Sequence, residues 1–95
     1  MIDTLEFRLV AGADDVGFLD ADRRVQTEVI PNHPGFLRRT TARAQDGGWL
    51  VIVLWQSEAD ASAFIETAEG HAAHRAFMEL VDPATVRRKR YTTLD

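Results

Sequence analysis

Three histidines are the side chains of this 95-residue chain that can exchange a proton near neutral pH, and the chain has no cysteine. Without cysteine it forms no disulfide, thiolate metal site or thiol nucleophile. His71 and His74 stand three residues apart in a predicted helix, so their imidazoles can share one face. An H-x-x-H pair without a carboxylate at helical spacing is a weak metal signal, and we predict no bound metal. His33, in the loop of residues 31–35, can act as a base or pocket lid, or simply lie at the surface.

The composition is that of one ordinary globular domain over residues 1–95. Hydrophobic residues make up 45% of the chain and charged residues 27%, a balance from which a small core can form. The net charge of −4 argues against a nucleic-acid partner and against adhesion to an anionic membrane. Residues 1–4 lack the basic and apolar pattern of a secretory signal, so we expect a cytoplasmic protein.

The hydrophobic pattern predicts the element order β-α-β-β-α-β. Strands, bounded by turn residues, are predicted at residues 3–10, 36–44, 49–55 and 87–94. Helical spacing predicts a helix from residue 15 to Pro31 and a second over 58–67, resumed over 71–81 after a break at Gly70. Two glycines, Gly47 and Gly48, supply the tight hairpin between the middle strands. This order predicts an α+β class, a ferredoxin-like fold with an antiparallel sheet and its helices on one face.

The third predicted strand, residues 49–55, contains no polar side chain. A strand in a sheet with helices on one face only should alternate between apolar and polar residues. Here one face would carry Trp49, Val51, Val53 and Trp55, and the other Leu50, Ile52 and Leu54. If three or four such side chains stay exposed to water, the fold loses roughly 5–10 kcal/mol of the free energy that their burial would contribute. That amount approaches the whole stability of a small domain. We therefore predict a homodimer whose second copy covers the open face; the alternative is a monomer with an apolar patch.

Three segments together resemble the antibiotic biosynthesis monooxygenase (ABM) superfamily. They are the loop Pro34-Gly35-Phe36, the segment Trp55-Gln56-Ser57-Glu58-Ala59-Asp60 entering a helix, and the later element Ala72-Ala73-His74. The resemblance covers nearly the whole chain and implies a dimeric α/β barrel built from two ferredoxin-like domains. The superfamily includes oxygenases, haem degraders, isomerases, decarboxylases and proteins without known activity, so the fold does not decide the function.

The resemblance also implies a ligand pocket between the helices and the sheet of each protomer. Superfamily oxygenases hold an electron-rich phenolic substrate and stabilise its anion, which requires a positive or hydrogen-bonding group near the phenolate. On this basis His74, Trp55 and Arg38 are the predicted catalytic residues, although Trp55 is equally explained as a core residue. The predicted substrate-binding residues are Phe7, Phe18, Phe64, Tyr91 and Asn32.

Three functions remain open from the sequence. The first is a cofactor-independent monooxygenase for a small aromatic substrate, polyketide-like or quinol-like. The second is a haem-binding or haem-handling protein that uses His74, because a histidine at this helix end ligates iron in haem-degrading members. Those members add a tryptophan about ten residues upstream and an asparagine on the first strand, where this chain has Phe64 and Phe7. The third is a non-catalytic accessory dimer.

Overall fold

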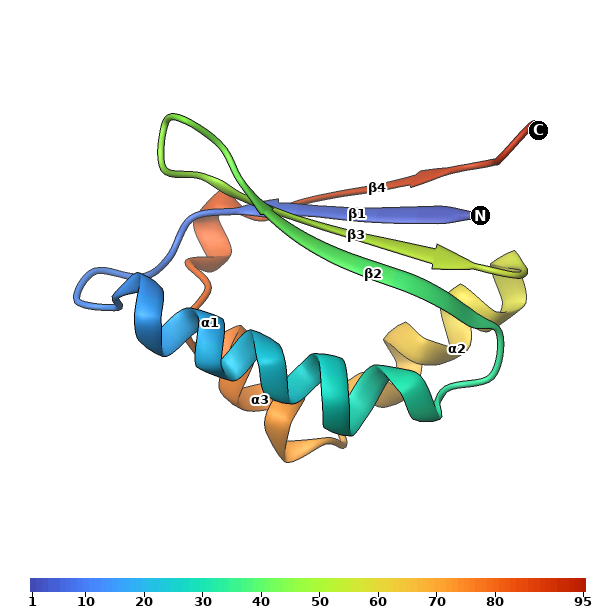
Figure 1. Ribbon diagram of the computed structural model, residues 1–95, viewed down its shortest axis with the longest axis horizontal. Helices are drawn as coiled ribbons and strands as arrows, with labels where there is room; N and C mark the ends of the chain where they lie inside the picture. Colours follow the sequence, from blue (N-terminus) through green and yellow to red (C-terminus); the bar gives the residue numbers. More distant parts are fainter.

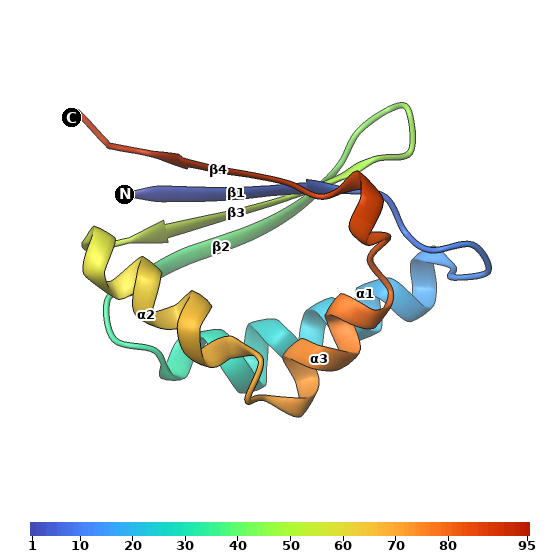
Figure 2. The same ribbon diagram turned by 180° about the vertical axis from the view of Figure 1, so that it is seen from behind.

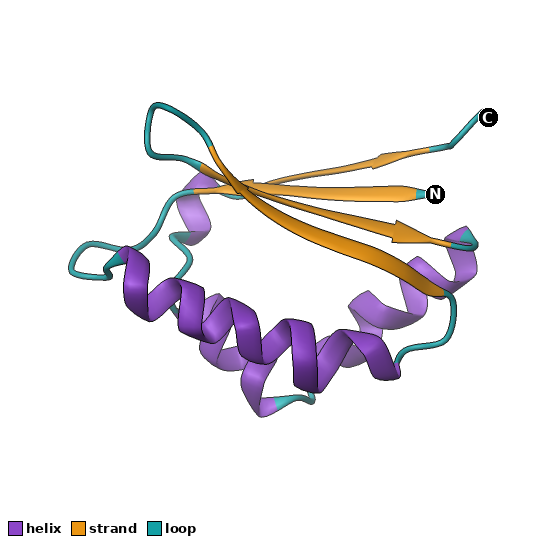
Figure 3. Cartoon of the chain, viewed as in Figure 1, coloured by secondary structure: helices purple, strands orange, loops and turns teal.

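A four-stranded antiparallel sheet in the order β2-β3-β1-β4 carries all of the helices on one of its faces (Figures 1 and 3). The computed structural model describes residues 1–95. The strands are β1 (Ile2–Phe7), β2 (Phe36–Arg43), β3 (Trp49–Trp55) and β4 (Arg87–Tyr91), and the helices are α1 (Asp15–Arg24), α2 (Glu58–Ala68) and α3 (Ala72–Glu79). The predicted ferredoxin-like α+β class is confirmed. No helix is both long enough and apolar enough to cross a membrane.

Three element boundaries differ from those predicted by three residues or more. Strand β1 ends at Phe7 rather than at residue 10, because the amide of Arg8 donates to Thr85 Oγ1 (2.8 Å) instead of to a strand. After α1 the chain continues as a short π-helix (η1, Val25–Val29) and a short 3₁₀ helix (η2, Ile30–Asn32). The helical backbone therefore extends beyond Pro31. Proline is tolerated there because it stands at the start of the short turn, where its missing N–H is not needed. Strand β4 ends at Tyr91, short of residue 94.

Strand β3 lies at the centre of the core. Its odd-numbered side chains, Trp49, Val51, Val53 and Trp55, are buried beneath the helices, and its even-numbered ones are half-buried on the other face. The register pairs Phe7 of β1 with Trp49, so both aromatic rings lie on the helix side. The predicted division of residues 49–55 between two apolar faces is therefore confirmed.

The interior beside the hairpin end of the sheet is a cluster of aromatic rings around Phe18 of α1. Phe18 is fully buried, and its ring centroid lies 4.6 Å from that of Trp49, 5.2 Å from Phe77 and 5.6 Å from Phe7. Offset and edge-on ring pairs of this kind add to the free energy gained from burial alone. Phe18 therefore fixes α1 and α3 against the sheet.

We expect Phe18→Ala to lower the free energy of unfolding by about 3–5 kcal/mol, because a large buried side chain leaves a cavity that its neighbours cannot fill. Urea denaturation followed by circular dichroism, at one fixed protein concentration, measures the change. Leu19→Ala is the matched control, since the neighbouring Leu19 is 43% exposed. Equal losses in the two variants would contradict the central place of Phe18.

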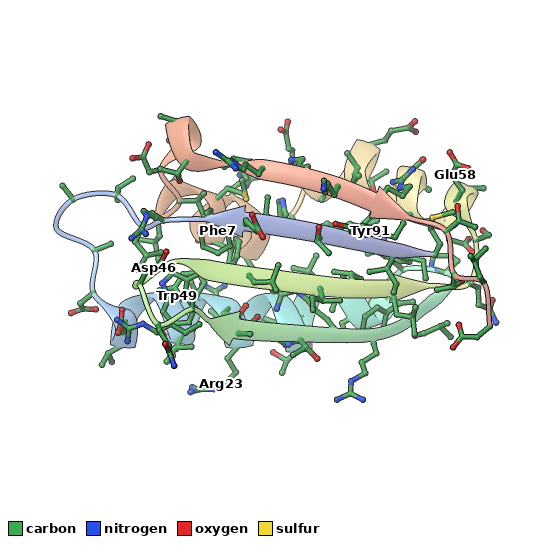
Figure 4. The ribbon with its side chains drawn as sticks, turned by 90° about the horizontal axis from the view of Figure 1, so that it is seen from above. Phe7, Arg23, Asp46, Trp49, Glu58 and Tyr91 are labelled. Carbon is green, nitrogen blue, oxygen red and sulfur yellow. The ribbon has the colours of Figure 1, made fainter.

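The face of the sheet turned away from the helices carries an apolar stripe. The strand register places Ile2, Leu50, Ile52 and Leu54 on this side, with Ala42 at the β2 edge. Charged side chains, among them Glu6, Arg38 and Arg87, stand around this stripe. Figure 4 looks onto this face, with the strands in front of the helices and Tyr91 labelled. Within a single chain no element covers it.

Candidate functional site

The break between α2 and α3 determines where His74 lies in the fold. Ser57 caps α2, and its hydroxyl accepts a hydrogen bond from the amide of Asp60 (3.1 Å). The helix ends at Ala68, and the chain turns through Gly70 before α3 begins at Ala72 (Figure 2). His74 therefore lies in the first turn of α3, facing β4 and the underside of the sheet.

A small inner cavity lies between the sheet and the helices, with a volume of about 70 Å³. This equals the space of roughly two water molecules. Its apolar wall consists of Leu5, Val25, Ile30, Val51, Val53, Trp55, Phe64, Ile65, Phe77 and Met78. Its polar lining consists of Asp3, Thr4, Arg39, His74 and Arg88. Most of the wall is apolar and a few polar groups converge on it, which is the usual character of a small-molecule site.

A larger outer cleft of about 470 Å³ opens beside this cavity, between α2, α3 and β4. Five residues line both spaces: Phe64, Ile65, His74, Met78 and Arg88. These shared residues form the boundary between interior and solvent. A planar aromatic ligand in the outer cleft can therefore reach the inner cavity with one edge.

His74 is the polar residue at this boundary that lacks a partner. Its Nδ1 is buried and makes no hydrogen bond, while Phe64 lies edge-on to the ring at 5.8 Å between centroids. Burial lowers the pKa of His74 below its ordinary value of 6.5, and the nearby cations Arg88 and Arg39 lower it further. Glu69 raises the pKa of His74, and His71 lowers it. The imidazole is therefore neutral at pH 7.

The tautomer of His74 follows from the same surroundings. A buried N–H without an acceptor costs more than a buried lone pair without a donor. The neutral ring is therefore better accommodated with its lone pair on the buried Nδ1 and its proton on Nε2, which is not among the buried atoms without a partner. His74 then offers a hydrogen-bond donor to a ligand at the boundary.

Two arginines add positive charge to the cavity. Arg39 of β2 donates from Nη1 to Asp22 of α1 at 2.7 Å, and Thr41 donates to the same carboxylate oxygen at 2.8 Å. The Arg39 guanidinium also lies over the ring of Phe77, 5.5 Å from its centroid. Arg88 of β4 pairs in register with Leu5, so it points to the helix side, and it forms no ion pair. The cavity is therefore electropositive.

The lowered pKa of His74 predicts how stability depends on pH. Above pH 6.5 the histidine is neutral in both the folded and the unfolded chain. As the pH falls through 6.5, the unfolded chain takes up a proton that the folded chain resists, so the free energy of unfolding decreases until the folded pKa is reached. The pKa of His33, lowered by burial and by His71, contributes in the same direction.

We expect the midpoint of urea denaturation to fall between pH 7.5 and pH 5, and His74→Gln to reduce this fall, because glutamine does not titrate. A pH dependence that is identical in the His74→Gln and unsubstituted proteins would refute the prediction.

The structure brings together some of the predicted site residues and separates the others. His74, Trp55 and Phe64 line the inner cavity, and the ring centroids of Trp55 and Phe64 are 5.3 Å apart. Phe7 and Phe18 belong to the buried aromatic cluster beyond Phe77 and do not line the cavity. The remaining three lie outside it: Arg38 pairs with Leu54 on the open face, Tyr91 is 46% exposed there, and Asn32 donates to the carbonyl of Glu28 (3.1 Å).

Arg39 and Arg88 line the cavity, and Asp22 holds Arg39 from behind, but the sequence patterns did not single out any of the three as a site residue. The signal for Arg39 is the hairpin register, which pairs it with Val53 and so turns it to the helix side, whereas its neighbour Arg38 turns away. Asp22 gave no signal, because an aspartate on a helix usually faces water and here it is 7% exposed. No group of three or more His, Asp or Glu side chains is arranged to hold a metal ion.

Together these features define a ferredoxin-like α+β protein with an aromatic, positively charged cavity between its helices and its sheet. No protein-family model matches the sequence, and no curated protein matches it either. Solved structures do share the fold. An N63A mutant of SnoaB, a cofactor-independent oxygenase from Streptomyces nogalater, superposes with a TM-score of 0.79 at 17% identity, over 99% of this chain and 92% of that one.

Two further structures agree with this match. A proposed antibiotic biosynthesis monooxygenase from Nitrosomonas europaea has a TM-score of 0.72 at 20% identity, over 100% of both chains. Another, from Bordetella bronchiseptica, has a TM-score of 0.72 at 14% identity, over 97% of both chains. The resemblance to the ABM proteins is thereby confirmed at the level of the fold. None of these structures is described as a haem protein, and the inner cavity that His74 lines is far too small for a porphyrin.

Proposed function

We propose that this protein is a cofactor-independent monooxygenase of the ABM type, acting on a small aromatic substrate with an ionisable oxygen. The observation that carries the proposal is His74, a neutral imidazole at the boundary of an aromatic cavity, with two arginines nearby. The description of SnoaB as a cofactor-independent oxygenase supports the reaction class.

Stabilising the substrate anion is the task of these residues. The Nε2–H of His74 donates to the substrate oxygen that gains negative charge, and Arg88 and Arg39 favour that charge electrostatically. His74 acts as a donor rather than as a base, because protonating its ring would create a buried N–H without an acceptor beside two cations. The substrate proton leaves through the open outer cleft to water.

The reaction itself needs only the ionised substrate and molecular oxygen. For an anthrone, the carbanion transfers an electron to O₂, and the carbon radical and superoxide join as a peroxide anion at the same carbon. This anion takes a proton from water and becomes a hydroperoxide. Loss of water from this hydroperoxide breaks the O–O bond and leaves a carbonyl. The ring methylene is oxidised to a ketone, one oxygen atom enters the product, and the other leaves as water.

Oxygen uptake with an anthrone tests the proposal. We expect enzyme-dependent consumption of one O₂ for each quinone formed, without added flavin, haem or metal, and unchanged after treatment with a chelator. Labelling with ¹⁸O₂ should place one labelled atom in the quinone. If no oxygen is consumed with any of several anthrones and quinols, the oxygenase is refuted. The non-catalytic accessory dimer is then the alternative that remains.

We propose as well that the functional form is a homodimer joined through the open face of the sheet. The stripe of Ile2, Leu50, Ile52 and Leu54 supports this, because no element of the chain covers it. A second copy would bury the same stripe against itself, as the symmetry of most homodimers requires. The charged side chains around the stripe would then form the rim of the interface.

A further inference from the structure

Arg39 is a buried guanidinium that its protein partners satisfy only in part. Its side chain is 4% exposed, and its Nη1 alone donates to the protein, to Asp22 Oδ1 (2.7 Å) and to Thr41 Oγ1 (3.3 Å). Nε and Nη2 have no partner in the chain, although Arg39 lines the inner cavity. A guanidinium has five N–H donors in a planar fork. These remaining donors are not sealed off from solvent, because His74 Nδ1 is the one buried side-chain polar atom without a partner. They are therefore available to a ligand that enters the cavity.

The size and charge of the cavity define that occupant. About 70 Å³, the space of roughly two waters, suits one carboxylate but not an aromatic ring. Asp22 compensates the charge of Arg39 from outside the cavity. The one carboxylate of the lining, Asp3, is already bound by Arg90 through bonds of 2.7 and 3.0 Å. Arg88, which is exposed to solvent at the mouth of the cavity, has no anionic partner in the chain. The lining therefore has unpaired positive charge and unpaired donors, but no unpaired carboxylate.

We propose that the inner cavity is a carboxylate subsite, in which Arg39 binds the acidic group of an aromatic acid whose ring lies in the outer cleft between α2, α3 and β4. Asp22 and Thr41 position Arg39 by fixing Nη1, so that its remaining donors face the cavity. The proposal names the substrate class of the site proposed above and rests on that site being the binding pocket. The substrate is then an aromatic acid that enters carboxylate first.

Two probes of equal shape test this assignment: 2-naphthoate, which carries a carboxylate, and 2-naphthamide, which does not. We expect isothermal titration calorimetry to show that the acid binds about 10–100-fold more tightly, the range of a charge-assisted hydrogen bond at a buried site. In nuclear magnetic resonance spectra, the Nε–H signal of Arg39 should shift with the acid only. Equal affinities for the two probes, or no binding of either, would overturn the proposal.

The decisive variant is the double substitution Asp22→Asn with Arg39→Gln. It removes both charges of the buried pair, so no uncompensated carboxylate is left to unfold the chain. We expect it to abolish the preference for the acid. The matched control is Asp15→Asn with Arg43→Gln, because Arg43 lies on the same face of β2, pairs with the same helix and stacks on Trp49 at 5.5 Å. That pair is exposed and lies outside the inner cavity.

Two results would show that the cavity does not select carboxylates. One is that both double variants lose the preference for the acid, and the other is that the Asp22 and Arg39 variant keeps it. The measurement is independent of catalysis. If no substrate consumes oxygen while the preference for the acid holds, the oxygenase is refuted and the subsite stands. If uncharged anthrones are oxidised and the naphthoate preference is absent, the subsite is refuted and the oxygenase stands.

Discussion

His74→Ala is expected to lower the rate of oxygen uptake by about 10²–10³-fold, the loss typical when one donor to a developing anion is removed. The imidazole is the only side chain at the boundary that can offer a neutral donor beside Arg88, and alanine offers none. The loss should appear in kcat rather than in KM, because the hydrogen bond strengthens as the substrate oxygen becomes charged. Initial rates measured with an oxygen electrode over a range of substrate concentrations separate kcat from KM.

Two comparisons make this result specific to His74. His74→Gln retains an N–H donor on a side chain of similar reach, and it should recover part of the lost rate. His71→Ala should leave the rate unchanged, because His71 precedes α3 and does not line the cavity. A full rate in His74→Ala would mean that the imidazole has no part in the reaction, and the site would need another donor.

Ile52→Glu is expected to abolish the dimer. Ile52 stands in the middle of the open face, in register with Thr4 of β1 and Thr40 of β2. A two-fold interface would bury both copies of the new carboxylate, and each costs several kcal/mol when desolvated without a partner. Because every 1.4 kcal/mol is a tenfold change in affinity, association should weaken by about three orders of magnitude or more.

Sedimentation or light scattering at micromolar concentration measures the mass. The unsubstituted protein should have twice the 10.7 kDa of one chain, and Ile52→Glu should have that of a single chain. Val16→Glu is the control, because Val16 is 79% exposed on α1, on the far side of the helices from the open face. A mass of one chain for the unsubstituted protein would disprove the dimer, and with it the interpretation of the apolar strand.

Most of the fold could be predicted because each element has a local cause. The two apolar faces of residues 49–55, the serine cap at Ser57 and the glycine break at Gly70 all act within a few residues, and the structure contains each of them. The boundaries that differ depend on distant contacts. Strand β1 stops early because Arg8 hydrogen-bonds to Thr85, which is 77 residues away in the chain and beyond the reach of any local pattern.

The site could be predicted only in part. The resemblance to the ABM proteins suggested His74, Trp55 and Phe64 as site residues, and the structure brings these three together around one cavity. The sequence also favoured Arg38, while the cavity contains Arg39. Adjacent strand residues point to opposite faces, so an error of one position moves a guanidinium from one side of the sheet to the other.

The chain carries three histidines and no cysteine, and that composition by itself excluded thiol chemistry and left imidazole as the group that titrates near neutral pH. It also determined the element order and the two apolar faces of β3, because propensity and period act locally. Only the tertiary structure decided which face the helices cover. That choice turned Arg39 inward to Asp22, buried Nδ1 of His74 without a partner and left Ile52 uncovered. These outcomes depend on packing between distant elements, which no local pattern encodes.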